Sequence, residues 1–394
     1  MPIKVLHTSD WHLGKRLFKY ERLEEQVQFL DWLYQHITKN QIDILIVAGD
    51  IFDVPSPPNN ALKVFYDFIA RLGELGSVQT VLITGNHDSA TLFDAPKLLF
   101  ETHNCHIYNR LDADLSKLEY YFEKDNQKIG IKLLPYFRNY ELQNHLVDSK
   151  DDEDQKVKKF FQNFLNKWKQ EPDIKILVGH HVFGNYELSG SEHAIYLSGV
   201  DHIPLNWVTP HFDYVALGHI HKKQALSKDP GVIYTGSPIP MRFSESNNKY
   251  ISEIKIESNN LSYDFVKIPI FKKLIQLKTK QKTYKEDIED LLLSSSNNSE
   301  TTLLEVMVQL EGPQTGIVTD IREMLKYTSI EMISFIPSFN TQEEKSTSYQ
   351  DVRSLNIMDL FDRYYYDKFG EETVPREMKE CFTSLLNEVK NEDT

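Results

Sequence analysis

The sequence predicts an α/β fold whose strands are buried on both faces. The first observation is a set of five short runs rich in Val, Ile and Leu, each of which ends in a polar turn: "IKVLHTSD", "DILIVAGD", "VQTVLITGNHD", "IKILVGHH" and "FDYVALGHIH". Continuous apolar runs of this length are typical of strands buried on both sides. The second observation is that longer segments with helical spacing separate the first three runs. Alternating strands and helices indicate an α/β architecture.

The bulk properties favour a multidomain cytoplasmic protein. A chain of 394 residues exceeds the usual size of a single core, so two or three domains are expected. No apolar run approaches the roughly 20 residues needed to cross a bilayer, and the first residues lack the pattern of a signal peptide. The two cysteines, Cys105 and Cys381, lie far apart in the sequence, which suggests a reducing compartment.

The net charge bears on the partners of the protein. A formal charge of −14 argues against a chain that coats nucleic acid on its own by neutralising phosphates. It does not exclude a nuclease, because carboxylates that bind metal belong to the acidic count and a partner can supply the basic surface.

The first domain is expected to span residues 1–270. Within it, helical spacing predicts helices over 21–37 and 59–75, between the first three strands. Two alternating segments around "SNN" in 249–270 predict a β-hairpin that closes this domain.

The remainder of the chain divides into three further parts. Residues 271–338 are expected to form a small α+β module, with strands at 303–312 and 330–339 and a helix at 315–328. Residues 339–352 have the composition of a linker. Residues 353–394 show the spacing of two amphipathic helices, which could dock on a partner or pack on their own domain.

Polar residues with metal-binding groups follow each of the five predicted strands. They are Asp10 and His12, Asp50, Asn86 with His87 and Asp88, His180 with His181, and His219 with His221. Because sites in α/β sheets form outside the carboxyl ends of the strands, we expect these side chains to meet. A buried cluster of this kind without a metal would contain unsatisfied polar atoms and charges. Only oxygen and nitrogen donors occur, which favours Mn²⁺ or Fe²⁺ and, less selectively, Zn²⁺ or Mg²⁺.

The number of donors suits two divalent ions. We assign one group of ligands to the first ion and another to the second, with Asp50 as the bridging ligand: Asp10, His12, Asp50 and His221, then Asp50, Asn86, His180 and His219. Two ions about 3.5–4 Å apart can bind both the attacking and the leaving oxygen of a phosphoryl displacement. The pattern therefore predicts phosphoester hydrolysis.

The ordered motifs D-x-H, G-D-x-x-D, G-N-H-D, G-H-H and G-H-x-H resemble those of the calcineurin-like metallophosphoesterase superfamily. The resemblance covers roughly residues 1–245. Within the superfamily, five strings are most similar to the SbcD-type nuclease subunits of bacteria, which are related to the Mre-type repair nucleases: "TSDWHLGK", "AGDIFDVPSPPNNA", "TGNHDS", "LGHIHKKQ" and "YTGSPIPMRFSES".

This resemblance implies a metallophosphoesterase β-sandwich flanked by helices. It implies that the module at 271–338 caps the site and binds DNA, and that helices at 353–394 bind the coiled coil of an SbcC-type, SMC-like ATPase. The implied enzyme is a homodimer within a heterotetramer, uses manganese, and degrades duplex ends and cuts single strands and hairpins during DNA repair and recombination. The alternative is a relative that acts on small phosphoesters.

The resemblance also implies roles for individual residues. His87 would contact the scissile phosphate and protonate the leaving oxygen, which suits an imidazole that titrates near neutral pH. Asp88 could hold the other ring nitrogen of His87 or cap a helix. The superfamily pattern favours His180 over His181 as a ligand. Archaeal relatives carry a histidine in place of Asp53, which is therefore expected to support the site or a turn rather than to act in catalysis.

Four basic residues are candidates for contacts with the DNA backbone. Lys15, Arg16 and Lys19 follow the first motif closely, where cations would meet phosphate. The alternative for these three is a solvated loop. Arg138 follows two aromatic residues and belongs either to a DNA contact or to the end of a core strand.

Overall fold

The computed structural model describes residues 2–138, 141–142, 153–189, 202–295, 301–311 and 316–339, together with Phe361, Tyr365, Val374, Pro375, Met378, Lys379 and Phe382. The chain separates into two units, Met1–Ser338 and Phe339–Thr394. Nearly all of the predicted linker at 339–352 and of the predicted helices at 353–394 lies outside the described residues. All features below belong to the first unit.

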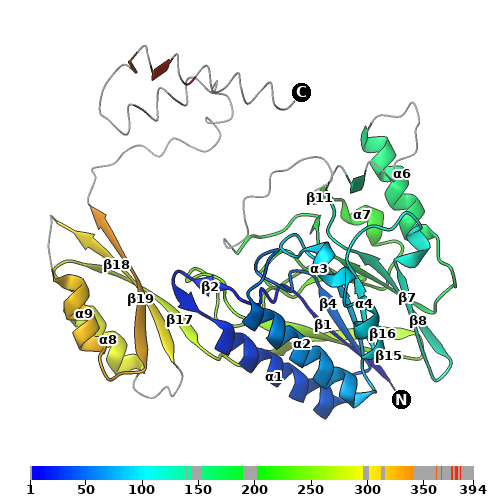
Figure 1. Cartoon of the computed structure of the whole chain (residues 1–394), viewed down its shortest axis with the longest axis horizontal. Helices are drawn as coiled ribbons and strands as arrows, with labels where there is room; N and C mark the ends of the chain where they lie inside the picture. The colour runs from blue at the N-terminus through cyan, green and yellow to red at the C-terminus, as the bar shows by residue number, and fades with distance from the viewer. Residues whose placement is uncertain are drawn as a thin grey trace. The chain divides into compact units, whose positions relative to one another are not determined.

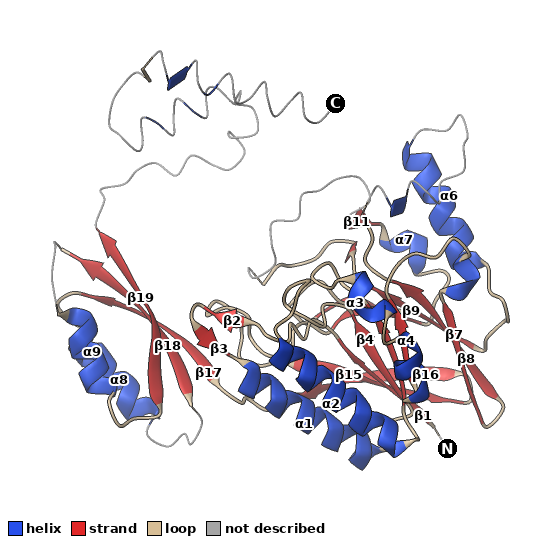
Figure 2. Ribbon diagram, in the orientation of Figure 1, coloured by secondary structure: helices blue, strands red, loops and turns tan. Residues whose placement is uncertain are grey.

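The first six-stranded sheet contains the first three predicted strands (Figures 1 and 2). Four of its strands are parallel neighbours, β1 (Ile3–Thr8), β4 (Ile44–Ala48), β5 (Gln79–Ile83) and β6 (Cys105–Tyr108). The predicted hairpin is confirmed as β15 (Tyr250–Glu257) and β16 (Asn260–Lys267), which extend the sheet antiparallel to β1. Its turn places Ser258 and Asn259 at positive φ (51° and 62°), as a tight two-residue hairpin requires.

The second six-stranded sheet contains the other two predicted strands. Its order is β13 (Gln224–Lys228), β14 (Gly231–Tyr234), β12 (Tyr214–Leu217), β9 (Ile174–Gly179), β8 (Gln127–Leu134) and β7 (Glu119–Lys124). The four inner strands are parallel, whereas β13 and β7 are antiparallel edge strands.

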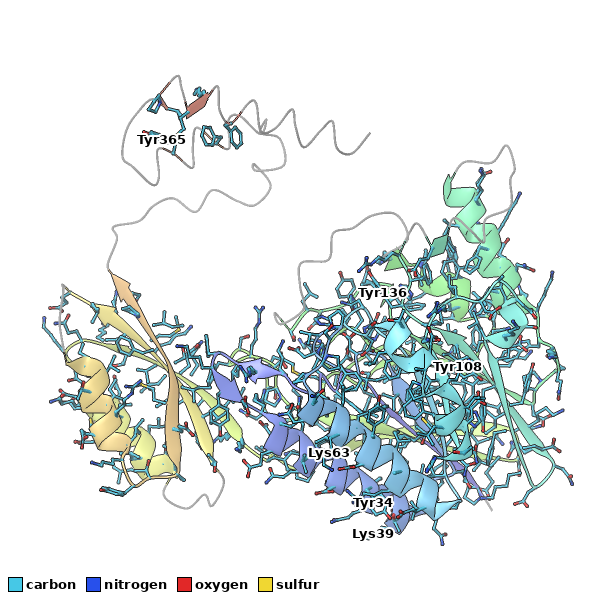
Figure 3. All side chains as sticks on the ribbon, viewed as in Figure 1. Tyr34, Lys39, Lys63, Tyr108, Tyr136 and Tyr365 are labelled. Atoms are coloured by element: carbon cyan, nitrogen blue, oxygen red, sulfur yellow. The ribbon has the colours of Figure 1, made fainter. Side chains whose placement is uncertain are left out.

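The two sheets pack face to face, and helices cover their outer faces. Figure 3 shows the described side chains on this framework. The core between the sheets includes Val5 and Ile46 from the first and Ile176 and Ala216 from the second. The first sheet packs on α1 (Leu23–Asn40) and α2 (Asn59–Leu75), the two helices that the spacing predicts. The second packs on α6 (Glu153–Asn166) and α7 (Leu205–Val208). The predicted β-sandwich flanked by helices is therefore confirmed.

Short elements connect these layers. They are β2 (Arg16–Leu17), β3 (Tyr20–Glu21), α3 (Ala90–Asp94), α4 (Lys97–Thr102), a 3₁₀ turn at Leu115–Lys117, β10 (Val182–Phe183) and β11 (His202–Ile203). Among the described residues, none of the helices combines the length and the apolar character that crossing a bilayer requires.

A small three-stranded sheet follows the sandwich. The predicted strand, helix and strand are confirmed as β18 (Thr302–Leu310), α9 (Ile317–Leu325) and β19 (Ile330–Phe339). Two elements that the sequence analysis did not predict precede them, β17 (Lys273–Lys280) and α8 (Tyr284–Ser295). Strand order is β17-β18-β19, and both helices contribute to one apolar cluster with β18.

Candidate metal centre

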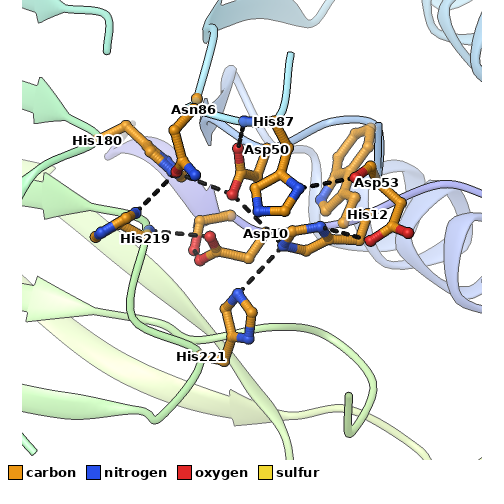
Figure 4. A network of polar contacts seen from close by, with 12 residues as sticks. Asp10, His12, Asp50, Asp53, Asn86, His87, His180, His219 and His221 are labelled. Atoms are coloured by element: carbon orange, nitrogen blue, oxygen red, sulfur yellow. Dashed lines mark hydrogen bonds and ion pairs between the residues drawn. The ribbon is translucent and has the colours of Figure 1, made fainter. Parts of the chain in front are cut away.

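The five motif-bearing loops meet at one place (Figure 4). Those after β1, β4 and β5 come from the first sheet, and those after β9 and β12 come from the second. Backbone hydrogen bonds align the first two loops: the amide of Asp10 donates to Gly49 O (3.0 Å) and that of His12 donates to Asp50 O (3.0 Å). The two sheets thus present their carboxyl ends at a common edge.

One group of donors consists of Asp10, His12, Asp50 and His221. One potential ligand atom from each residue lies within 4.8 Å of the others, and all four residues are buried. His12 Nε2 is 3.5 Å from Asp50 Oδ2 and 3.1 Å from His221 Nε2. Two imidazole nitrogens that face each other beside carboxylates are suitably placed to share a cation. These residues are the ones assigned above to the first ion.

A second group surrounds the amide of Asn86. Asn86 Oδ1 lies 3.1 Å from His180 Nε2 and 2.9 Å from His219 Nδ1. The same Nε2 of His180 is 3.3 Å from Asp50 Oδ2. Asp50 therefore contacts both groups, as a bridging ligand would.

The electrostatics of the cluster favour a bound positive charge. Burial raises the pKa of Asp10, although the neighbouring His180 opposes this shift. Burial also opposes ionisation of Asp50, but the imidazoles of His180 and His12 outweigh it and hold the pKa of Asp50 well below its usual range. Burial lowers the pKa of His219 to about 3, which keeps this imidazole in the neutral form that binds metals.

Two candidate ligands are oriented by an oxygen on their outer side. His180 Nδ1 lies 2.7 Å from Ala48 O, and His12 Nδ1 lies 3.3 Å from Asp53 Oδ1. In both rings Nε2 consequently faces the centre. Metal-binding histidines commonly have their second nitrogen held in this way, which fixes the ring and raises its basicity. This arrangement is the observation on which we base the fit of the residues to metal ions.

The backbone at the centre is strained. Asp10, His12, Asp50 and His219 all have positive φ, at 54°, 46°, 50° and 94°. Non-glycine residues rarely adopt this conformation, and it costs on the order of 1–3 kcal/mol at each position. Strain at four candidate ligands indicates that the fold stabilises this arrangement for a function.

Two of the motif glycines are required by close contacts. A Cβ at Gly218 would lie 1.9 Å from Ala48 O, and one at Gly85 would lie 2.2 Å from Asp50 Oδ1. Any side chain at either position would therefore displace the loops that carry the donors.

His87 lies beside the first group of donors. Its amide donates to Asp50 Oδ1 (2.9 Å), and its ring packs edge-on against that of His12, with centroids 4.8 Å apart. Its Nδ1 is 2.7 Å from Asp53 O. Asp53 therefore contacts two imidazoles, one through its side chain and one through its carbonyl, in agreement with a supporting role.

Asp88 has a different role from the one expected. Its carboxylate accepts hydrogen bonds from three backbone amides, those of Ile51 (3.1 Å), Phe52 (2.9 Å) and Gly85 (2.8 Å). It therefore joins the loops after β4 and β5, whereas Nδ1 of His87 is held by Asp53. The residue before α3 is Ser89, so Asp88 does not cap this helix either. Burial and the charge of Asp50 raise the pKa of Asp88 to about 7.

His181 lies outside the donor cluster. Its Nε2 is 3.3 Å from Pro135 O, and its ring packs against Tyr136 and Phe137. Burial lowers its pKa to about 3, so it is a neutral core residue. Of the two histidines in "GHH", His180 is the one that faces the other donors.

The basic candidates have different surroundings. Lys15 Nζ is 2.9 Å from Asp53 Oδ1, so this lysine contacts the same carboxylate that supports His12. Arg16 pairs with Glu21, and Lys19 is exposed at the turn between β2 and β3. Arg138 is exposed, and its backbone amide donates to Glu141. Their role in DNA binding stays a prediction.

Sequence reasoning missed three contacts that support the centre. Ser9 Oγ donates to Asp10 Oδ2 (2.6 Å), and the amide of His219 donates to Asp10 Oδ1 (2.9 Å). The buried Lys249 reaches the backbone oxygen of His221 (3.3 Å). The contacts of His219 and Lys249 join loops that lie far apart in the sequence, so no spacing rule points to them.

Comparisons with known proteins identify a family and several relatives to which this chain is similar. The family model described as calcineurin-like phosphoesterase matches residues 3–223. The SbcD subunits of the nuclease SbcCD from Bacillus subtilis and from Escherichia coli K12 are each 26% identical to the chain; the matches cover 99% of this chain and 100% and 99% of those proteins. A solved structure described as a dimetal phosphatase from Danio rerio matches 68% of this chain and 100% of that one, with 12% identity and a TM-score of 0.41.

Proposed function

The chain belongs to the calcineurin-like phosphoesterase family, and from this premise we propose that it is a two-metal-dependent DNA nuclease. The family accounts for a metal-dependent hydrolase of phosphate esters. The choice of DNA as substrate is supported by the end-to-end similarity to proteins named as nuclease subunits. We further propose double-strand exonuclease and single-strand or hairpin endonuclease activity.

The observation that carries the proposal is the convergence of the two donor groups on Asp50. The residues fit a pair of divalent cations, one held by Asp10, His12, Asp50 and His221 and the other by Asp50, Asn86, His180 and His219. Such ions, when bound, supply a nucleophilic hydroxide and stabilise charge on the phosphoryl oxygens. The oxygen and nitrogen donors suit manganese, which we propose as the metal.

His87 is proposed as the general acid. The carbonyl of Asp53 keeps Nδ1 of this ring protonated, so the proton that the leaving oxygen receives comes from Nε2. Asp50 holds the backbone of His87 through the 2.9 Å hydrogen bond to its amide, which couples the position of the acid to the ligand loops.

Comparing two substrates tests the function. We expect manganese-dependent degradation of a linear duplex, and also hydrolysis of bis-p-nitrophenyl phosphate, since both contain a phosphodiester. Chelation should abolish both activities. Hydrolysis of the small ester without any attack on DNA, even in the presence of the ATPase partner, would contradict the nuclease and favour a phosphodiesterase of small substrates.

The proposed partner is an SbcC-type, SMC-like ATPase in the cytoplasm. Support comes from the names of the relatives, which describe subunits of a complex. In this proposal the module at 271–338 caps the site and contacts DNA, and the segment 353–394 binds the coiled coil of the ATPase.

A homodimer within this complex is supported by an apolar surface on α4. Leu98 and Leu99 are 78% and 61% exposed, and Tyr66 of α2 stacks on Phe100 beside them. Exposed leucines that cluster in this way are typical of an interface. We expect Leu98→Glu/Leu99→Glu to convert the dimer into a monomer in light scattering, whereas Leu293→Glu, at a leucine 74% exposed on α8, should leave it a dimer. A double variant that stays dimeric would contradict this interface.

A further inference from the structure

A cavity of about 530 Å³ adjoins the candidate metal centre. Its described lining consists of residues 188–189, 221–223, 244–246 and 248–250, and so includes His221 and Tyr250. It therefore begins at a candidate metal ligand and continues along the start of β15. Its volume falls in the range of roughly 300–1,000 Å³ typical of small-ligand sites, so it can hold a nucleotide-sized part of a larger substrate.

Three lysines line the cavity, in a chain whose net charge is −14. Lys249 is buried and its charge is balanced, because its Nζ lies 2.5 Å from Glu245 and 2.9 Å from Ser237 Oγ. Lys222 pairs with Glu187, whose side chain is 75% exposed. Lys249 therefore has a structural role in the cavity wall, and Lys222 belongs to an ion pair near solvent.

Lys223 differs from both. Its Nζ lies over two aromatic rings, 3.8 Å from the centroid of Tyr250 and 4.5 Å from that of Phe265. In the described ranges no carboxylate forms an ion pair with it. Aromatic faces position an ammonium group without cancelling its charge. Two aromatic rings thus hold the ammonium group of Lys223 at the wall of the cavity.

The lining also offers neutral polar groups. Ser244, Ser246 and Asn248 are exposed and line the cavity, whereas Glu245 and Lys249, which lie among them in the sequence, are buried. Ser246 Oγ accepts the amide of Asn248 (3.1 Å), so its hydroxyl proton can be donated elsewhere. A cation held in the same cavity as hydroxyl and amide groups suits a ligand that carries phosphate oxygens together with other polar groups.

We infer that this cavity binds the phosphodiester backbone of the DNA strand next to the bond that is cleaved, with Lys223 contacting a phosphate. This subsite rests on the proposed nuclease function, since a neighbouring phosphate exists only in a polymeric substrate. A small diester such as bis-p-nitrophenyl phosphate has no second phosphate for Lys223 to contact.

The test compares Lys223→Met with wild type in the full-length protein. Binding of a fluorescein-labelled single-stranded oligonucleotide is measured by anisotropy with manganese, between about 50 and 200 mM salt. Losing one phosphate contact should weaken binding roughly threefold to tenfold and reduce the slope of log affinity against log salt by about one. Lys223→Arg should restore most of the binding. Turnover of bis-p-nitrophenyl phosphate should be unchanged.

Lys255→Met is the matched control. It also removes one lysine charge, but Lys255 lies on β15 and does not line the cavity. Its salt slope should equal that of wild type. A Lys223→Met protein with the wild-type slope, or one that loses bis-p-nitrophenyl phosphate turnover to the same degree, would overturn the subsite. Because binding needs no cleavage, a wild-type protein that binds DNA with the predicted Lys223 dependence but never cuts it would refute the nuclease function alone.

Discussion

Asp50 is the residue on which both donor groups depend. Its Oδ2 lies 3.5 Å from His12 and 3.3 Å from His180, and its Oδ1 accepts the amide of His87. A single carboxylate thus connects both proposed ion sites to the proposed acid. We propose a different role for His87, whose Nδ1 lies 2.7 Å from Asp53 O and whose ring packs against that of His12.

This difference predicts opposite behaviour for two variants. His87→Ala should keep manganese and lose turnover by about 10²–10⁴-fold, the usual contribution of a general acid. Asp50→Ala should lose manganese as well as activity. Metal analysis after desalting, combined with turnover of bis-p-nitrophenyl phosphate, checks both. A His87→Ala protein without bound metal would show that His87 is a ligand instead.

A second prediction concerns the carboxylate behind His12. Asp53→Ala removes the group 3.3 Å from His12 Nδ1 and the partner of Lys15. We expect manganese affinity to fall by about 10–100-fold, as for other carboxylates that orient a metal-binding histidine. Calorimetric titration of the metal-free protein measures this affinity. Wild-type affinity in the variant would mean that Asp53 only shapes the turn.

The candidate ligands could be predicted because each lies within a few residues of the end of an apolar run. Asp10, Asp50 and His219 occur where the sequence changes abruptly from strand to polar turn. The role of Asp88 could not be predicted, because it depends on where two backbone amides of another loop lie beside that of Gly85. Adjacency to His87 in sequence suggested a side-chain contact, and the fold uses Asp88 to join loops instead.

At the level of elements, the turns after the strands determine the geometry of the site. Gly179 and Gly218 each directly precede a candidate ligand, His180 and His219. A Cβ at Gly218 would lie 1.9 Å from Ala48 O, whereas one at Gly179 would lie 3.3 Å from the ring of Phe183. The backbone at Ala48 cannot move aside as readily as the ring of Phe183. Substitution should therefore be tolerated less well at Gly218 than at Gly179.

Gly218→Ala should therefore destabilise the protein by on the order of 1–3 kcal/mol through overpacking and lower its metal content. Gly179→Ala should cost clearly less, because the ring of Phe183 can shift. Urea unfolding at equilibrium measures the difference. Equal stability of the two variants would contradict the close contact with Ala48.

Elements with a strong local pattern were predicted well. The helices α1 and α2, the five strands and the hairpin β15–β16 were all recognisable from spacing. Strand β17 was not predicted, because "KLIQLKTK" mixes lysine with apolar residues and only part of it is buried. The apolar runs also did not indicate how the five motif-bearing strands divide between two sheets, because such a run does not specify which strands lie beside it.

At the scale of the whole sandwich, the function depends on how the two sheets pack. The core between them includes Ile3, Ile44 and Val81 on one side and Ile131, Val178 and Ile233 on the other. This packing brings His12 and His221, whose positions differ by 209 in the sequence, to within 3.1 Å between ring nitrogens. The metal centre is therefore a property of the folded sandwich rather than of any one segment.

The most direct test of this account is the anomalous diffraction of manganese in crystals soaked with MnCl₂. We expect two peaks about 3.5–4 Å apart, with the carboxylate of Asp50 between them. The first should be bound by Asp10, His12 and His221, and the second by Asn86, His180 and His219. A map with no peak beside Asp50, or with the imidazoles of His180 and His221 turned away from it, would contradict the central claim.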